Sequence, residues 1–228
     1  NPRVPRRALV FEMHLDRAGH CTHTELTRAR IRSRHKLSFG EVQGLWDDPR
    51  GSSLASAEPT ESLLALREVS QVHLAEASER DVPRHRRDEA ELGIDGRRFV
   101  VLSSVRSEVE LANEQLSLLC NAEGARLLAA SGAPGLQPIY RVHPSPAPNR
   151  LERLRDGIAR LVELRRLDPE VFAWRGPGSD QSLAAWLAGL PDGGEGGRVA
   201  RAIQRQAILV NVGATYSPEP GVHHGVGV

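Results

Sequence analysis

The stretch IYRVHPSP, residues 139–146, decides how the second half of the chain is interpreted. Pro138 disfavours helix in the residue before it and the Ile-Tyr pair favours a strand, so residues 137–142 are expected to be extended. The prolines at 144 and 146 predict a rigid loop after this strand. A long helix is expected before it, over residues 104–130, ended by Gly132 and Pro134.

Another helix is expected after this strand, because Asn149 and Glu152 form a capping pattern in front of apolar residues at the helical period. Its core face would consist of Leu151, Leu154, Ile158, Leu161 and Leu164. The glycine-rich residues 193–197 are expected to form a flexible loop, followed by a helix over about residues 199–210. The last residues alternate between small and apolar types, as in an unfinished strand.

The N-terminal residues predict strands. Residues 8–15 alternate in polarity, with Leu9, Phe11, Met13 and Leu15 on one face, as in a half-buried strand. Residues 16–19 form a turn, and residues 20–31 are expected to return as one or two further strands. The result would be a small antiparallel meander that needs covering helices to be stable.

Two helices are expected next. Ser38 and Glu41 form a capping box that starts a short helix, whose core residues are Val42, Leu45 and Trp46. After a loop over residues 47–59, a longer amphipathic helix is expected to residue 78. The charged residues 80–95 are interpreted as an exposed connection, followed by a short strand over residues 98–102. The expected fold class is therefore α+β: a mixed, largely antiparallel sheet packed with several helices.

Composition limits the possible classes of protein. A chain of 228 residues can bury a sizeable core, and a single domain over residues 1–228 is the default. No apolar run approaches the roughly 20 residues needed to span a bilayer, so no membrane partner is expected. Cys21 and Cys120 have no spacing typical of a metal site or a disulfide framework, which indicates a reducing cytoplasm.

The formal net charge of +1 neither supports nor excludes a nucleic-acid partner. Lys36 is the only lysine, and arginine suits phosphate and stacks on bases, although genome composition is the favoured explanation of this preference. A basic cluster lies next to the aromatic Phe39, a combination that can hold phosphates and stack a base. It consists of Arg30, Arg32, Arg34, His35 and Lys36. The alternative is an exposed arginine face with Phe39 as a core residue at a helix start.

Four segments, residues 31–39, 110–119, 139–146 and 216–228, resemble in this order the ribonuclease II and ribonuclease R family. The first matches that family at Ile31, Arg32, Ser33, Lys36, Leu37, Ser38 and Phe39. The second matches it at Leu111, Ala112, Asn113 and Glu114, with Glu108 one residue from the position of a family acid. The third matches it at Tyr140, Arg141, Val142, His143 and Pro146, and the fourth at Tyr216, Ser217, His223 and Gly225.

The resemblance implies an α+β catalytic domain and residues that contact single-stranded RNA. The implied RNA-binding residues are Arg32, Ser33, Lys36, Phe39, Glu108, Asn113, Tyr140, Arg141, His143, Tyr216 and His223. Structural alternatives exist for several of these: a buried hydrogen bond for Asn113, a hydrogen-bonded core position for His143, and simple packing for Tyr140. No zinc site is expected at His223 and His224, because no third ligand stands at a suitable spacing.

For the complete protein, the resemblance implies a metal-dependent 3′-to-5′ exoribonuclease that uses Mg2+ and releases nucleoside 5′-monophosphates. Its aspartate cluster, D-x5-D-x-D-D, does not occur in the sequence, and Asp47-Asp48 is the only adjacent aspartate pair. Residues 1–228 are therefore expected to form a partial catalytic domain without catalytic residues, inactive by itself. The metal ligands, a downstream arginine motif and RNA-binding domains would lie in flanking segments.

Two other classes remain open. A non-catalytic RNA-binding or scaffold protein that kept the architecture would show the same four segments. An unrelated α+β protein would have no affinity for single-stranded RNA, whereas phosphate contacts predict binding that weakens steeply with salt.

Overall fold

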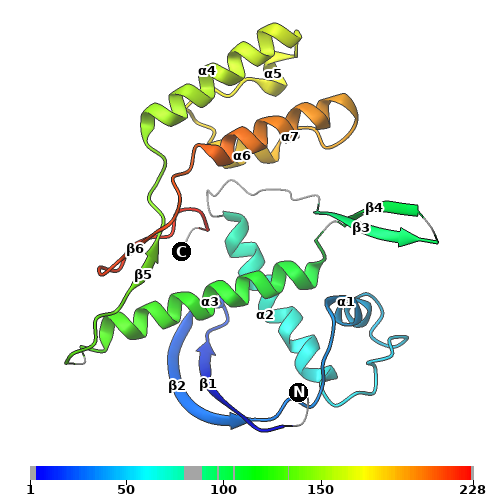
Figure 1. The fold of residues 1–228 in the computed structure, drawn as a ribbon, viewed down its shortest axis with the longest axis vertical. Coiled ribbons are helices and arrows are strands. Elements are labelled where there is room, and N and C mark those ends of the chain that lie inside the picture. The colour runs from blue at the N-terminus through cyan, green and yellow to red at the C-terminus, as the bar shows by residue number, and fades with distance from the viewer. Residues whose placement is uncertain (1–3, 80–88, 97, 105, 133, 227–228) are drawn as a thin grey trace. The chain divides into compact units, whose positions relative to one another are not determined.

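The computed structural model describes residues 4–79, 89–96, 98–104, 106–132 and 134–226. The chain divides into two compact units, Asn1–Ser78 with Asp88–Leu127, and Glu79–Arg87 with Leu128–Val228. Helices and strands are interspersed in both (Figure 1), and the described strands pair as three separate two-stranded antiparallel sheets. The α+β fold class is confirmed. The single partial domain over residues 1–228 stays a prediction.

Unit 1 begins with a long antiparallel hairpin of β1 (Arg6–Leu15) and β2 (Cys21–Ile31). Residues 20–31 therefore return as one strand, not as part of a longer meander. Phe11, Met13 and Leu15 are half-buried as expected, but Leu9 is 63% exposed. The predicted apolar face is thus covered only toward the turn, where Gly19 adopts a φ of 85° that favours glycine.

The turn half of the hairpin is fastened to α3 (Glu108–Ala130). The Thr24 hydroxyl donates a buried hydrogen bond of 2.5 Å to the Glu123 carboxylate. Arg126 also donates to this carboxylate. The hydrogen bond from Arg126, followed by that from Thr24, lowers the pKa of Glu123. A Cβ at Gly124 would lie 3.6 Å from the Phe11 ring, in ordinary van der Waals contact. The hairpin is therefore held by both polar and apolar contacts.

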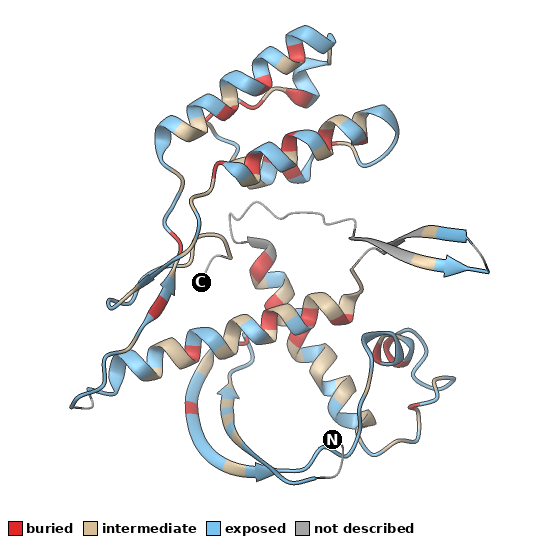
Figure 2. Ribbon diagram, in the orientation of Figure 1, coloured by how far each residue is buried: buried red, intermediate tan, exposed pale blue. Residues whose placement is uncertain are grey.

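The two helices expected after the hairpin are confirmed as α1 (Phe39–Asp47) and α2 (Thr60–Glu79). Both hydrogen bonds of the capping box between Ser38 and Glu41 are present. The core of unit 1 joins α1, the following turns and the start of α3 (Figure 2). Its buried members are Val42, Leu45, Trp46, Leu54, Val109 and Ala112.

The interpretation of residues 80–95 as a connection is wrong where the structure describes them. Residues 89–95 form β3 (Glu89–Asp95), which pairs with β4 (Arg98–Ser104) after Gly96 at a φ of 61°. Asp95-Gly96 is a hairpin turn signal that the sequence interpretation missed. Residues 80–88 lie outside the described residues. The long helix also starts later than expected, at Glu108, because Ser107 and Glu110 form their own capping pair.

The described residues of unit 2 include four complete helices and a short two-stranded sheet. Its elements are β5 (Tyr140–Val142), α4 (Pro148–Arg165), α5 (Pro169–Phe172), α6 (Leu183–Ala188), α7 (Gly194–Leu209) and β6 (Thr215–Ser217). The sequence interpretation did not include α5 and α6. Buried residues gather between α4, α6 and α7 (Figure 2), around the stacked rings of Trp174 and Trp186.

Three details of unit 2 correct the sequence interpretation. Asn149 is not a cap, because α4 starts one residue earlier at Pro148, whose fixed φ suits the first helical position. Leu164 is 75% exposed, since it lies about 200° around the helix from the buried Val162. The glycine-rich residues 193–197 are not a loop. They form the first turn of α7, where a Cβ at Gly197 would lie 2.3 Å from the Asp192 carbonyl oxygen.

Residues 222–226 do not form the expected strand; His223 makes one isolated bridge and a turn follows. Among the residues that the structure describes, none of the helices combines the length and hydropathy required to cross a membrane.

Candidate functional site

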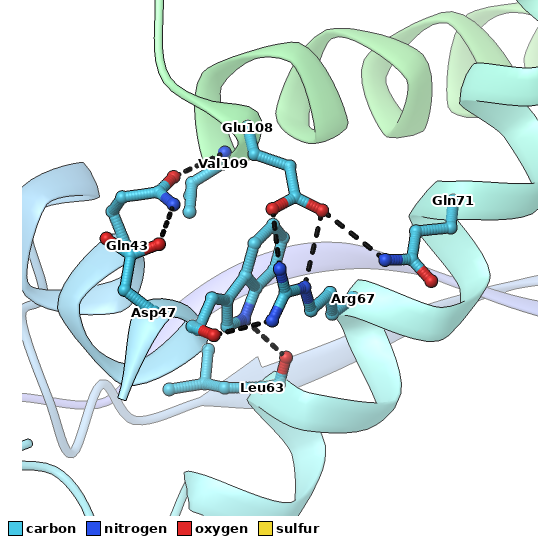
Figure 3. Close-up of polar contacts among 8 residues, drawn as sticks. Gln43, Asp47, Leu63, Arg67, Gln71, Glu108 and Val109 are labelled. Atoms are coloured by element: carbon cyan, nitrogen blue, oxygen red, sulfur yellow. Dashed lines mark hydrogen bonds and ion pairs between the residues drawn. The ribbon is translucent and has the colours of Figure 1, made fainter. Parts of the chain in front are cut away.

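A polar network in unit 1 joins α1, α2 and α3 (Figure 3). The Arg67 guanidinium pairs with Glu108 across two contacts, of 2.8 and 3.3 Å, and donates to the Trp46 carbonyl oxygen. It also lies over the Trp46 ring, 5.5 Å from the centroid, and the indole N–H donates to the Leu63 carbonyl oxygen. Gln71 completes the set with a long contact of 3.5 Å to Glu108.

Glu108 is therefore already engaged within the protein. Its carboxylate neutralises Arg67, and the backbone N–H of the next residue, Val109, donates to the Gln43 side chain. This arrangement fixes the start of α3 against α1 and α2. A role of Glu108 in RNA binding stays a prediction, while its part in the helix junction is visible directly.

The basic segment after β2 is open to solvent. Arg32, Ser33 and Lys36 are exposed, and residues 32–38 belong to no helix or strand. Phe39 is 48% exposed, so the alternative that makes it a core residue is wrong. Two further members of the cluster, Arg34 and His35, both approach the Glu58 carboxylate. The exposed cations are thus available to an anion.

Asn113 is exposed on α3, whereas the sequence alternative placed it in a buried hydrogen bond. The buried residues of that helix stretch are Val109, Ala112 and Gln115, so Asn113 lies off the core stripe. Its amide is therefore free to meet an external partner.

In unit 2, the expected segment around residues 139–146 forms β5 and the loop after it. Tyr140 is 6% exposed and packs in the protein, while Arg141 is exposed. On the paired strand β6, Tyr216 lies opposite Arg141 and is 77% exposed. The β5–β6 pair thus presents a cation, Arg141, and an aromatic ring, Tyr216, at directly opposite and exposed positions.

His143 occupies a buried, hydrogen-bonded position, as one sequence alternative proposed. Its Nδ1 accepts a 2.9 Å hydrogen bond from the Gly225 N–H, which places the proton of the neutral ring on Nε2. Its ring stacks on His223, with centroids 5.1 Å apart and an interplanar angle of 16°. Burial, followed by the charges of His223 and His224, holds the pKa of His143 below its ordinary value of 6.5.

The sequence model of one protein family, described as the RNB domain, matches residues 1–228. The chain belongs to the RNB domain family. The prediction of a resemblance to the ribonuclease II and ribonuclease R family is confirmed. A search of curated protein sequences found no match.

Solved structures of other RNB proteins share the fold. The chain is 21% identical to Mycoplasma genitalium RNase R in complex with ribose methylated single-stranded RNA, with a TM-score of 0.76. The match covers 100% of this chain and 34% of that one. A complex of the same RNase R with double-stranded RNA gives a TM-score of 0.77 at 21% identity, covering 100% and 38%. Yeast Ssd1, a pseudonuclease, gives a TM-score of 0.60 at 13% identity, and the match covers 100% of this chain and 26% of Ssd1.

The chain thus spans about a third of the length of the RNase R chain that it matches. The implied RNA-binding residues of the RNB domain fall into two groups, one in each unit. Unit 1 holds Arg32, Ser33, Lys36, Phe39, Glu108 and Asn113, and unit 2 holds Tyr140, Arg141, His143, Tyr216 and His223. Their assignment to RNA stays a prediction.

Among the residues of the RNB domain that the structure describes, the carboxylates do not fit a Mg2+ site. Asp47 accepts from Gln43, and Asp48 accepts the backbone N–H groups of Arg50 and Gly51 in a local turn. Within the described ranges, no three His, Cys, Asp or Glu side chains are grouped so that they could hold a metal ion.

Sequence reasoning missed the partners of Glu108. Arg67 lies on the half-buried side of α2, four residues after Leu63, and a cation on such a stripe requires a partner. That signal was present in the sequence, but only the fold identifies Glu108 and Trp46 as the groups that Arg67 meets.

Proposed function

We propose that this chain is part of a 3′-to-5′ exoribonuclease of the ribonuclease II type. The complete protein would hydrolyse single-stranded RNA to nucleoside 5′-monophosphates in cytoplasmic RNA decay or processing. The observation that carries the proposal is the RNB match over residues 1–228. The likeness to an RNase R whose structure contains single-stranded RNA supports the same function.

Within that protein, this chain would supply the wall of an RNA channel and structural support for it. Exposed cations such as Arg32, Lys36 and Arg141 would neutralise phosphates, which orients a strand without selecting its sequence. The exposed rings of Phe39 and Tyr216 offer stacking surfaces that accept any base. The Arg67–Glu108 junction would keep the underlying helices in place.

Magnesium would be held by carboxylates in flanking segments, together with further RNA-binding domains. When bound, two such ions activate a water molecule and stabilise the leaving oxygen. The residues described above would not hold the metal, so this chain by itself would bind RNA without cleaving it.

A second candidate is a non-catalytic RNA-binding or scaffold protein. The likeness to yeast Ssd1, a pseudonuclease, favours it. Both candidates predict affinity for single-stranded RNA, and only the first predicts hydrolysis.

The experiment uses the complete polypeptide that contains these residues, with a 5′-labelled single-stranded RNA and Mg2+. The exoribonuclease predicts a ladder of products shortened from the 3′ end, together with nucleoside 5′-monophosphates. Omission of Mg2+ is the control and should abolish the ladder. Binding without any shortening would favour the scaffold, and the absence of binding would reject both candidates.

A further inference from the structure

The open end of the β1–β2 hairpin carries a regular pattern of positive charge. From residue 28 to residue 36 the sequence is RARIRSRHK, with arginine or lysine at every even position. Alternate residues of a strand point to the same face, so Arg28 and Arg30 share one face of β2. Their Cα atoms are about 6.8 Å apart, twice the rise of about 3.4 Å per residue.

The strand register adds a third arginine to this face. Arg30 pairs with Arg7 of β1, and Arg28 pairs with Leu9 two residues further along. Residues that are directly opposite share a face, and like charges in that position destabilise the strand pair. The hairpin therefore keeps an electrostatically unfavourable pair, Arg7 and Arg30, in its folded form.

No group of the described chain compensates these charges. The side chains of Arg7, Arg28 and Arg30 are exposed, and none of the three guanidinium groups forms a hydrogen bond or an ion pair with another described residue. The carboxylates of the hairpin, Glu12 and Glu25, lie closer to its turn. An external anion can therefore reach all three arginines.

The same face is fixed in position at its other end. Phe11 follows Leu9 on this face and lies near Gly124 of α3, where an added Cβ would be 3.6 Å from its ring. The Thr24 hydroxyl donates a hydrogen bond to Glu123 of the same helix. The hairpin is a continuous curved ribbon from this anchored half to its open end (Figure 1). The arginines therefore lie on a hairpin whose turn half is fixed against α3.

We propose that Arg7, Arg28 and Arg30 form a phosphate-binding surface for the backbone of single-stranded RNA, which extends the exposed segment at residues 32–36 back along the hairpin. This inference rests on the proposed function and adds Arg7 and Arg28 to the basic cluster that already includes Arg30. A chain of phosphates supplies several anions in a row, and the guanidinium fork binds each phosphate through two hydrogen bonds. Contacts of this kind read no base sequence.

The test is the affinity of the 228-residue chain for a fluorescein-labelled oligouridylate, measured by fluorescence anisotropy over a series of NaCl concentrations. The variant is R7Q/R28Q/R30Q. A matched control, R160Q/R198Q/R205Q, removes the same charge from exposed arginines of α4 and α7. Circular dichroism verifies that both variants remain folded.

Each phosphate contact to a single strand contributes about 0.7 to the slope of log K against log salt, so the hairpin variant should lose about 2 units of slope. The control should keep the slope of the original chain, and an oligoadenylate should give the same difference. An unchanged slope in the hairpin variant, or an equal loss in the control, overturns this inference and leaves the proposed function standing. If the original chain shows no affinity for either oligonucleotide at low salt, both are overturned.

Discussion

Arg67 of α2 and Glu108 of α3 meet in a two-contact ion pair, with Nη2 2.8 Å from Oε2 and Nε 3.3 Å from Oε1 (Figure 3). Both side chains are about 30% exposed, so water screens the pair only in part. The same guanidinium covers the Trp46 ring and donates to its carbonyl oxygen. One side chain thus holds three helices together.

We expect R67M to lower the free energy of unfolding by about 1–3 kcal/mol, because charged hydrogen bonds are lost at a partly buried junction. Urea unfolding measures the loss. The control is R17M, which replaces an exposed arginine near the hairpin turn. The double variant R67M/E108Q should reveal coupling between the two residues. Additive effects of the two single substitutions would contradict the inferred pair.

The two tyrosines of the β5–β6 sheet should behave oppositely. Y216A should weaken binding of single-stranded RNA by about 1–3 kcal/mol through lost stacking, with little change in stability, because Tyr216 is exposed. Y140A should destabilise unit 2, since Tyr140 is buried. Anisotropy and urea unfolding on both variants separate the two effects, and loss of stability in Y216A would refute its assignment as a contact residue.

Gly225 should tolerate no side chain. A Cβ there would lie 3.2 Å from two atoms of the His143 ring, which is itself held by stacking on His223. We expect G225A to lower the free energy of unfolding by about 1–3 kcal/mol through overpacking. G213A is the matched control, because a Cβ at Gly213 meets no atom within 4 Å. Equal stability of the two variants would show that the ring has room to move.

Acidic pH should weaken the contact between His143 and the Gly225 segment. The pKa of His143 is lowered on folding, mainly by burial, so the unfolded chain binds more protons between the folded pKa and 6.5. The stability that this residue contributes is therefore present above pH 6.5 and is lost as pH falls through the folded pKa. On protonation, Nδ1 also stops accepting from Gly225.

NMR titration of the imidazole should give His143 a pKa below 6.5, with H143N used to assign its signal. In H143N the amide oxygen replaces Nδ1 as acceptor, and urea unfolding should depend less on pH than in the original chain. The original chain, unfolded at the same pH values, is the control. A His143 pKa at or above the ordinary value would disprove the assignment.

Calorimetry with Mg2+ should detect no stoichiometric binding to this chain, because Asp47 and Asp48 are engaged in local hydrogen bonds. D47N/D48N should therefore give the same heats as the original chain. Tight binding that disappears in the double variant would place a metal site in this loop and reverse the assignment of ligands to flanking segments.

Local sequence signals predicted local structure well. The capping box at Ser38 and Glu41 and the alternation of Phe11, Met13 and Leu15 each depend on neighbours within a few residues. The same rules were misapplied where two signals competed. Glycines at 193–197 indicated a loop, although close approach of the backbone at Gly197 requires glycine inside a helix.

Contacts between distant residues were not predictable from one sequence. Glu108 was recognised as a candidate, but its partner Arg67 is defined only by the crossing of α2 and α3. The exposure of Asn113 likewise depends on which side of α3 meets α1, and a helical period with several apolar stripes does not decide that. The stacking of His143 on His223 joins segments on either side of four helices.

The Thr24–Glu123 hydrogen bond also bears on how the protein is made, because its partners are 99 residues apart in the chain. At about 5–20 residues per second, the ribosome takes roughly 5–20 s to synthesise that interval. During this time β1 and β2 have no α3 to rest on, and an isolated hairpin is only marginally stable. The nascent β1–β2 hairpin therefore lacks its hydrogen bond to Glu123 until α3 has been synthesised.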